Sequence, residues 1–131
     1  LDVGKSAYEK RYKIDTRDAL HALRNAGGIP ILAHPGEKLA NLHLEKLLLD
    51  LKVHGLLGIE VYHPSHNKAL TNYYYGIASK KKLVITGGSD FHGDINMTPG
   101  GYQDKIGRYG LNDYLMQRLL KTHEKMYRKS K

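Results

Sequence analysis

The chain has 131 residues, enough for one domain with one modest core. Apolar residues make up 40% and charged residues 26% of the sequence, so we expect a globular protein rather than a disordered one. No apolar run approaches the roughly 18 residues that span a bilayer, and residues 1–15 are too polar for a signal peptide. Cysteine is absent, which excludes disulfides and thiolate metal sites and fits a cytoplasmic location.

The formal net charge of +8 favours an anionic partner such as a phosphate compound or a nucleic acid. The densest basic clusters are 80–82 and 121–131, which lie at the C-terminal ends of expected helices. Cations are stabilised there by the helix dipole, so a structural explanation is favoured over a nucleic-acid groove. A non-catalytic basic module that binds RNA or another anion remains the alternative function.

Residues 1–15 have no clear period and are expected to form an irregular lead-in. The apolar periods of the remaining chain predict seven elements and a long loop. In chain order these are a helix over 16–26, a strand over 29–33, a helix over 42–53, a strand over 56–62, a helix over 66–80, a strand over 83–86, a glycine-rich loop over 93–110 and a helix over 112–127. Strands that alternate with helices indicate an α/β protein with a parallel sheet and right-handed crossovers.

The same periods predict which helical side chains face the core. They are Leu20, Leu23, Leu44, Leu47, Leu48, Leu51, Ala69, Leu70, Tyr73, Ile77, Ala78, Leu111, Tyr114, Leu115, Leu119 and Met126. Asp15 or Thr16 is expected to cap the first helix and Asn41 the second. Three consecutive tyrosines, 73–75, would point about 100° apart on a helix, so one or two core tyrosines are favoured over a base-stacking surface.

Polar, metal-capable residues follow each predicted strand. The three motifs are His34-Pro35-Gly36, the run from Glu60 to His66, and Ser89-Asp90-Phe91-His92. Sites in parallel α/β folds form at the C-terminal ends of strands, so these motifs are expected to meet. Asp90 and His92 stand two residues apart and would point to one side of a strand end. Together with His34 they suit a divalent metal such as Mn, Fe or Zn.

The other residues of these motifs leave alternatives open. A buried Glu60 needs a partner, which could be a metal, a lysine or backbone amides. One of His63 and His66 could contact a substrate phosphate while the other caps the next helix. Ser89 could donate a hydrogen bond to a ligand or only shape its turn. In addition, Asp94 and Arg108 could reach the site from the glycine-rich loop. His54, just beyond a helix, has no assigned role.

Three histidines, His21, His43 and His123, fall in helices away from any strand end and are interpreted as surface or packing residues.

The segments 27–35, 58–62 and 86–93 together resemble the polymerase and histidinol phosphatase (PHP) superfamily of metal-dependent phosphoesterases. The resemblance covers roughly residues 16–120 and is strongest to the branch that cleaves nucleoside bisphosphates or short oligonucleotides. It implies a distorted, TIM-like (β/α)7 barrel with two or three divalent metal ions, commonly Mn, Fe, Zn or Mg. His34, Asp90 and His92 match metal ligands of the family, and His66 matches a histidine near the substrate phosphate.

The H-x-H and T-D-H motifs of the family do not occur in this sequence. Together with the leucine at position 1, this absence predicts a fragment, in which 1–15 ends an insertion and 16–131 forms the C-terminal half of the barrel. Such a half is expected to turn over little or no substrate, and to self-associate through its exposed sheet edges.

The resulting expectation is a parent phosphoesterase that attacks phosphate esters of nucleotides or short oligonucleotides with a metal-activated water. Glu60 and His66 are the expected catalytic residues, and His63, His66 and Ser89 the expected substrate contacts.

Overall fold

The computed structural model describes residues 12–38, 43–91 and 106–128. In chain order its elements are α1 (Thr16–Asn25), β1 (Ile31–Leu32), α2 (Pro35–Lys38), α3 (Leu44–Val53), β2 (Gly58–Tyr62), α4 (Lys68–Lys80), β3 (Val84–Gly87) and α5 (Asp113–Tyr127). The predicted alternation of helices and strands is confirmed. The short helix α2 was not predicted, because Pro35 was interpreted only as the end of a strand. Proline is also favoured at the first position of a helix, where no amide hydrogen is needed.

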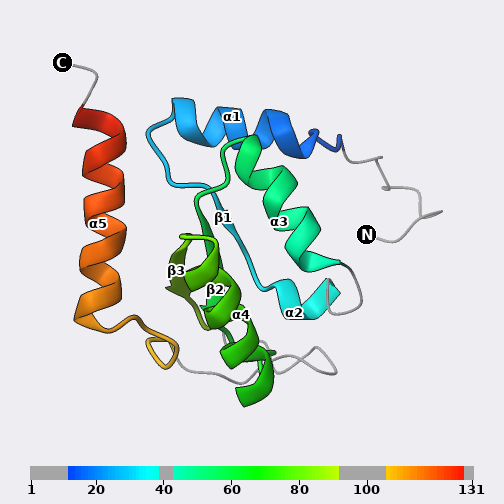
Figure 1. Ribbon diagram of the computed structural model, residues 1–131, viewed down its shortest axis with the longest axis vertical. Coiled ribbons are helices and arrows are strands. Elements are labelled where there is room, and N and C mark those ends of the chain that lie inside the picture. The colour runs from blue at the N-terminus through cyan, green and yellow to red at the C-terminus, as the bar shows by residue number, and fades with distance from the viewer. Residues whose placement is uncertain (1–11, 39–42, 92–105, 129–131) are drawn as a thin grey trace, which may run out of the picture.

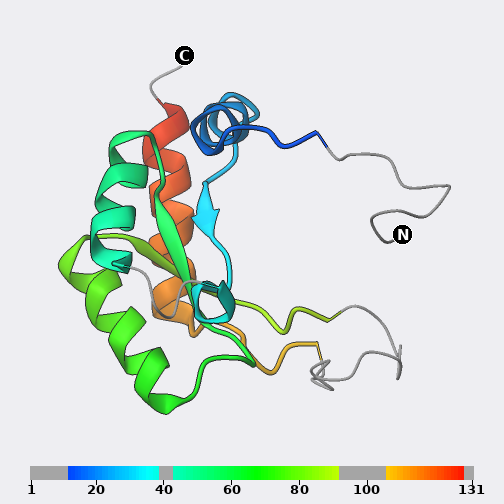
Figure 2. The same cartoon turned by 90° about the vertical axis from the view of Figure 1, so that its right-hand side faces the viewer.

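The three strands form one parallel sheet in the order β1-β2-β3. Gly58 of the central strand is aligned with Ile31 on one side and Val84 on the other. A side chain at Gly58 would collide with both neighbours, so this close approach requires glycine. In Figures 1 and 2, α3 and α4 cover one face of the sheet and α5 runs beside β3, whereas the opposite face carries no helix from the described part of the chain.

The core lies between the sheet and these helices. Its most buried apolar residues include Leu48 of α3, Ile59 and Val61 of β2, and Ala78 of α4, all with 0% of their surface exposed. Within β2 the side chains of Ile59 and Val61 on one face are fully buried, whereas those of Glu60 and Tyr62 on the other face are only partly buried.

Four of the predicted inward residues are wrong, because Leu23, Ala69, Tyr73 and Tyr114 are exposed. Leu23 is 50% exposed, Tyr73 is 50% exposed and Tyr114 is 66% exposed. The buried tyrosine of α4 is Tyr74, which lies three residues before Ile77 on the face that packs against the sheet. One residue is about 100° of helix rotation, so burying Tyr74 turns Tyr73 outward. The expectation of one or two core tyrosines among the three is confirmed.

In the described ranges, the side chains of three residues cap helices. The carboxylate of Asp15 accepts from the backbone N–H of Arg17 at 2.8 Å, and Asn67 and Asn112 accept from residues three positions on at 2.9 Å. Asn67 precedes α4, so the expectation that His63 or His66 caps that helix is wrong. Asn41 lies outside the described residues. No helix in the described ranges has the length and apolar character required to cross a membrane.

Candidate metal centre

The C-terminal ends of the three strands meet at one end of the sheet, at the bottom of Figures 1 and 2. The end of β1 continues directly into α2 through His34. The end of β2 continues through His63 to His66, and the end of β3 leads to Asp90. A parallel sheet thus gathers polar residues that are more than fifty positions apart in the sequence.

Helix α2 supplies a residue that the sequence interpretation missed. Glu37 Oε2 lies 3.6 Å from His34 Nδ1. The two residues are three positions apart, which places them on one side of the turn that Pro35 opens. The sequence signal was present as an acidic residue three positions after the histidine. It was overlooked because no helix was expected there.

His63 is the most buried titratable residue of the cluster, with 1% of its surface exposed. Its Nδ1 atom accepts a hydrogen bond from the backbone N–H of Ser65 at 3.2 Å and lies 2.7 Å from Ser65 Oγ. Its Nε2 atom lies 3.9 Å from Asp90 Oδ2. The contacts at Nδ1 therefore orient the ring so that Nε2 is directed toward the carboxylate.

Ligand atoms of Glu37, His63 and Asp90 lie within 4.8 Å of one another. The ring of His34 lies 5.4 Å from that of His63, centroid to centroid. Imidazole nitrogens and carboxylate oxygens at such separations form a donor set that fits a divalent transition metal such as Mn, Fe or Zn. The residues present therefore fit the metal that the sequence motifs indicated.

Two of these residues have unusual backbone conformations. His34 has φ of 25° and Asp90 has φ of 50°, in the left-handed region that non-glycine residues rarely adopt. Such strain persists only where surrounding contacts hold it, and it is concentrated at functional sites. Asp90 stands three positions beyond the end of β3, so strand alternation does not determine its direction. His92 and Asp94 lie outside the described residues, and their roles stay predictions.

Glu60 has a backbone partner. Its Oε2 atom accepts a hydrogen bond from the backbone N–H of His34 at 2.7 Å. Of the three alternatives for this carboxylate, the structure shows the backbone amide.

Both ring nitrogens of His66 are hydrogen-bonded. Nε2 accepts from the backbone N–H of Gly36 at 3.1 Å, and Nδ1 lies 2.9 Å from the carbonyl oxygen of Val61. Because an amide can only donate, the proton of the neutral ring resides on Nδ1 and is donated to Val61. Burial lowers the pKa of His66, against the opposing effect of the hydrogen bond to the Val61 carbonyl, and so favours the neutral ring.

The remaining candidates contribute less to this cluster. Ser89 is half-buried between β3 and Asp90. The guanidinium of Arg108 lies 5.9 Å from the ring centroid of Tyr109. His123 Nε2 lies 3.1 Å from the carbonyl oxygen of Gly27, and His54 Nδ1 lies 2.8 Å from that of Asp50.

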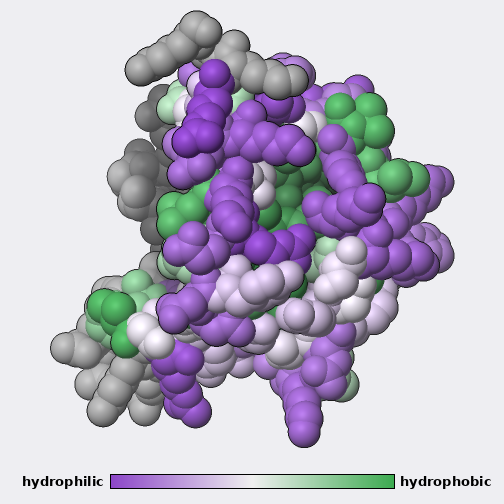
Figure 3. Space-filling view, turned by 60° about the vertical axis from the view of Figure 1, so that its left-hand side comes forward, coloured by the Kyte–Doolittle hydropathy of each residue, from purple (hydrophilic) through white to green (hydrophobic). Residues whose placement is uncertain are grey.

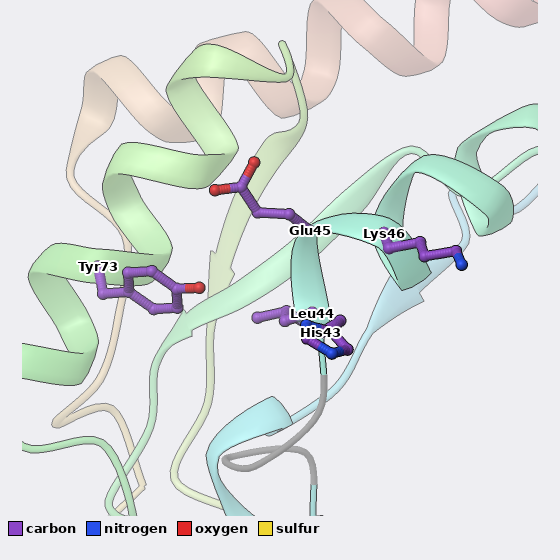
Figure 4. A pocket seen from close by; sticks show the side chains of 5 residues that line it. All are labelled: His43, Leu44, Glu45, Lys46 and Tyr73. Carbon is purple, nitrogen blue, oxygen red and sulfur yellow. The ribbon is translucent and has the colours of Figure 1, made fainter.

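A pocket of about 520 Å³ lies elsewhere, between α3 and α4. Figure 4 shows its lining, with Tyr73 contributed by α4 and His43, Leu44, Glu45 and Lys46 by the start of α3. No residue of the cluster lines it. In the face shown in Figure 3, hydrophilic side chains are spread out with apolar patches between them.

Comparison with known proteins relates this geometry to a reaction class. The chain is 42% identical over 86 residues to phosphoribosyl 1,2-cyclic phosphate 1,2-diphosphodiesterase of Eggerthella lenta, which covers 66% of this chain and 31% of that protein. It is 33% identical over 93 residues to 3′,5′-nucleoside bisphosphate phosphatase of Chromobacterium violaceum, and this match covers 70% of this chain and 33% of that protein. The relatives of this chain are phosphoesterases. They confirm the resemblance to PHP phosphoesterases that the sequence motifs indicated.

A third phosphoesterase relative is a 5′-3′ exoribonuclease of Haemophilus influenzae, 33% identical over 93 residues, which are 70% of this chain and 34% of that protein. The chain thus spans about a third of the length of its curated phosphoesterase relatives. No family model matches it.

Solved structures extend the likeness to the fold of these phosphoesterases. A proposed metal-dependent phosphoesterase of Bifidobacterium adolescentis matches with a TM-score of 0.70 and 26% identity, covering 91% of this chain and 40% of the other. An amidohydrolase of Chromobacterium violaceum with bound sulfate and no metal matches with a TM-score of 0.62 and 28% identity. This match covers 93% of this chain and 42% of the other.

Proposed function

We propose that this chain forms the C-terminal half of a distorted (β/α)7 barrel in a metal-dependent phosphoesterase that hydrolyses phosphate esters of nucleotides or short oligonucleotides. The observation that carries the proposal is the cluster of Glu37, His63 and Asp90, with ligand atoms within 4.8 Å, at the carboxyl end of a parallel sheet. The relatives act on phosphate esters and supply the reaction class. The helix-free face of the sheet, among the described residues, supports the half-barrel.

In the proposal, His34, Glu37, His63, Asp90 and His92 are the residues that hold divalent metal, of the Mn, Zn, Fe or Mg type. When bound, the metal lowers the pKa of a coordinated water and neutralises charge on the phosphate. The buried ring of His63 and the adjacent strand ends limit the access of bulk water on one side of this centre.

The remaining members of the site serve the substrate and the metal ligands. Ser89 donates a hydrogen bond to the substrate, and His63 is an alternative contact for its phosphate. Glu60 and His66, expected to be catalytic, also belong to the proposed site. The hydrogen bonds of Glu60 and His66 decide between two roles, namely reaction with the substrate and positioning of other groups.

The proposal is tested with a chimera in which the 93 aligned residues of this chain replace the matching third of the 3′,5′-nucleoside bisphosphate phosphatase of Chromobacterium violaceum. Phosphate release from a nucleoside 3′,5′-bisphosphate is measured for the chimera and for this chain alone. We expect turnover by the chimera that a chelator abolishes and Mn²⁺ restores, and no turnover by the chain alone, which lacks the H-x-H and T-D-H motifs.

A folded, Mn-loaded chimera without activity would overturn the phosphoesterase assignment. RNA binding by the chain that weakens steeply with salt and ignores the chelator would favour the basic binding module instead.

Self-association is a further part of the proposal. The described residues leave one face of the sheet without a helix, and large apolar side chains such as Tyr12, Val53 and Ile106 are more than 75% exposed. Exposed apolar surface favours association. Light scattering of the chain is expected to give a mass above 14.8 kDa that rises with concentration. A constant monomer mass at high concentration would contradict this expectation.

A further inference from the structure

We infer that Glu60 and His66 are positioning residues: together they hold the turn that presents His34 and Glu37 to the metal, and neither reacts with the substrate. This inference rests on the proposed function, because it assigns the turn a role in metal binding. It replaces the catalytic roles expected for the two residues. The observations that carry it are the hydrogen bonds to the turn, the backbone conformation of the turn and the close packing around both side chains.

The turn of His34, Pro35 and Gly36 has two amide hydrogens to satisfy, because proline has none. Glu60 accepts the N–H of His34 at 2.7 Å, and His66 accepts the N–H of Gly36 at 3.1 Å. Each available donor of the turn is therefore bound by a side chain from β2 or the segment that follows it. A hydrogen bond to a carboxylate is among the stronger kinds, which suits the amide of the strained residue.

His34 needs such support because its backbone φ of 25° is unfavourable for a residue with a side chain. The conformation turns the chain from β1 into α2, so it sets where both the imidazole of His34 and the carboxylate of Glu37 lie. If the two hydrogen bonds were lost, the turn could relax and the two ligands would separate from His63 and Asp90.

Both positioning side chains are packed tightly against glycine backbone. A Cβ atom added to Gly36 would lie 2.9 Å from His66 Nε2, and one added to Gly88 would lie 2.8 Å from Glu60 Oε1. The carboxylate of Glu60 thus sits between the end of β1 and the segment after β3. The buried ring of His66 leaves no room for a side chain at Gly36, whereas the end of the Glu60 side chain would have to shift to admit one at Gly88.

The surroundings of His66 also argue against a reacting role. The residue is 7% exposed, and its ring meets that of Tyr74 edge-on at 4.8 Å. Both ring nitrogens are engaged with backbone atoms, one as donor and one as acceptor. Proton transfer to a substrate would require breaking one of these bonds, whereas positioning uses both as they stand.

Glutamine substitutions separate the two roles. A glutamine side chain offers an NH2 group that donates and a carbonyl oxygen that accepts, but it cannot exchange a proton near neutral pH. His66→Gln and Glu60→Gln are therefore expected to keep the affinity for Mn²⁺ within about fivefold of the original chain. His66→Ala and Glu60→Ala are expected to weaken it by about tenfold or more, as for other residues that orient metal ligands. Titration calorimetry on the 131-residue chain measures both.

Amide hydrogen exchange gives a readout that needs no metal. Glu60→Ala should reduce the protection of the His34 amide, and His66→Ala that of the Gly36 amide, each by up to about tenfold, while the glutamine variants retain it. The matched controls are Glu45→Ala and His54→Ala, which remove the same residue types from α3 and its C-terminal end. They should change neither amide.

The outcomes distinguish this inference from the proposed function. If the original chain binds no Mn²⁺ but the amides respond as described, the phosphoesterase assignment weakens and the structural role of the two residues stands. If Mn²⁺ binds and both glutamine variants lose it as fully as the alanine variants, the positioning role is overturned. If an alanine variant does not fold, the glutamine variants still distinguish the positioning role from the reacting role. Glutamine cannot take over the function of a group that transfers a proton. In the chimera, His66→Gln should restore turnover relative to His66→Ala, with the pH profile of the chimera that keeps His66.

Discussion

Replacing His34 by alanine is expected to lower the affinity of this chain for Mn²⁺ by at least about 100-fold, beyond the 10- to 100-fold typical of a residue that only orients a ligand. The imidazole lies 3.6 Å from Glu37 and beside the buried ring of His63, so it is placed to complete the donor set. Its removal leaves the other ligands too few to displace the hydration shell of the ion. Titration calorimetry or the relaxation of water protons by bound Mn²⁺ measures the change.

The matched control is His21→Ala, which removes an exposed histidine from α1. Its affinity for Mn²⁺ should equal that of the original chain. Asp90→Ala should reproduce the loss seen for His34, because Asp90 belongs to the group of ligand atoms within 4.8 Å of one another. Equal affinity in the His34 variant and the His21 control would exclude His34 as a ligand.

Leu48→Ala is expected to reduce the free energy of unfolding by about 3 kcal/mol, within the 2–5 kcal/mol range for leucines in well-packed cores. Leu48 has 0% of its surface exposed and lies in the core cluster with Ile59, Tyr74 and Ile77. Its removal leaves a cavity that rigid neighbours cannot fill. Since small domains are stable by only about 5–15 kcal/mol, this single change removes a large share of the stability.

Leu49→Ala provides the control, because Leu49 is the next residue of α3 and is 58% exposed. It should change the stability by less than about 1 kcal/mol. Urea denaturation followed by far-UV circular dichroism measures both variants. Similar losses in the two would show that the chain does not bury α3 as the structure has it.

Local sequence patterns determined the order of the elements and most of their boundaries. Asp15, Asn67 and Asn112 each stand directly before a helix and cap it through their side chains. Leucines at 44, 48 and 51 recur at helical spacing and are buried in α3. These features depend on residues within one or two turns of each other, so a single sequence carries them.

Which face of each helix is buried depended on the packing of the whole domain. Tyr73 and Tyr74 have the same chemistry and neighbouring positions, yet only Tyr74 meets the sheet. Leu23 fits the period of α1, but that helix contributes only Leu20 to the core. A helical period gives the direction of an apolar stripe around the helix axis only to within about one residue. The elements that pack against the helix then determine which residues of the stripe are buried.

For the site, local sequence patterns placed Glu60 within a strand and His34, His63, His66 and Asp90 after strand ends, which parallel strands bring together. The contacts that connect these residues followed from the packing of the whole domain. The tertiary structure showed Glu37 beside His34, His63 directed at Asp90, and Glu60 and His66 bound to the amides of the turn. The physical reason is that these contacts join residues up to thirty positions apart, through backbone conformations that a local pattern does not encode.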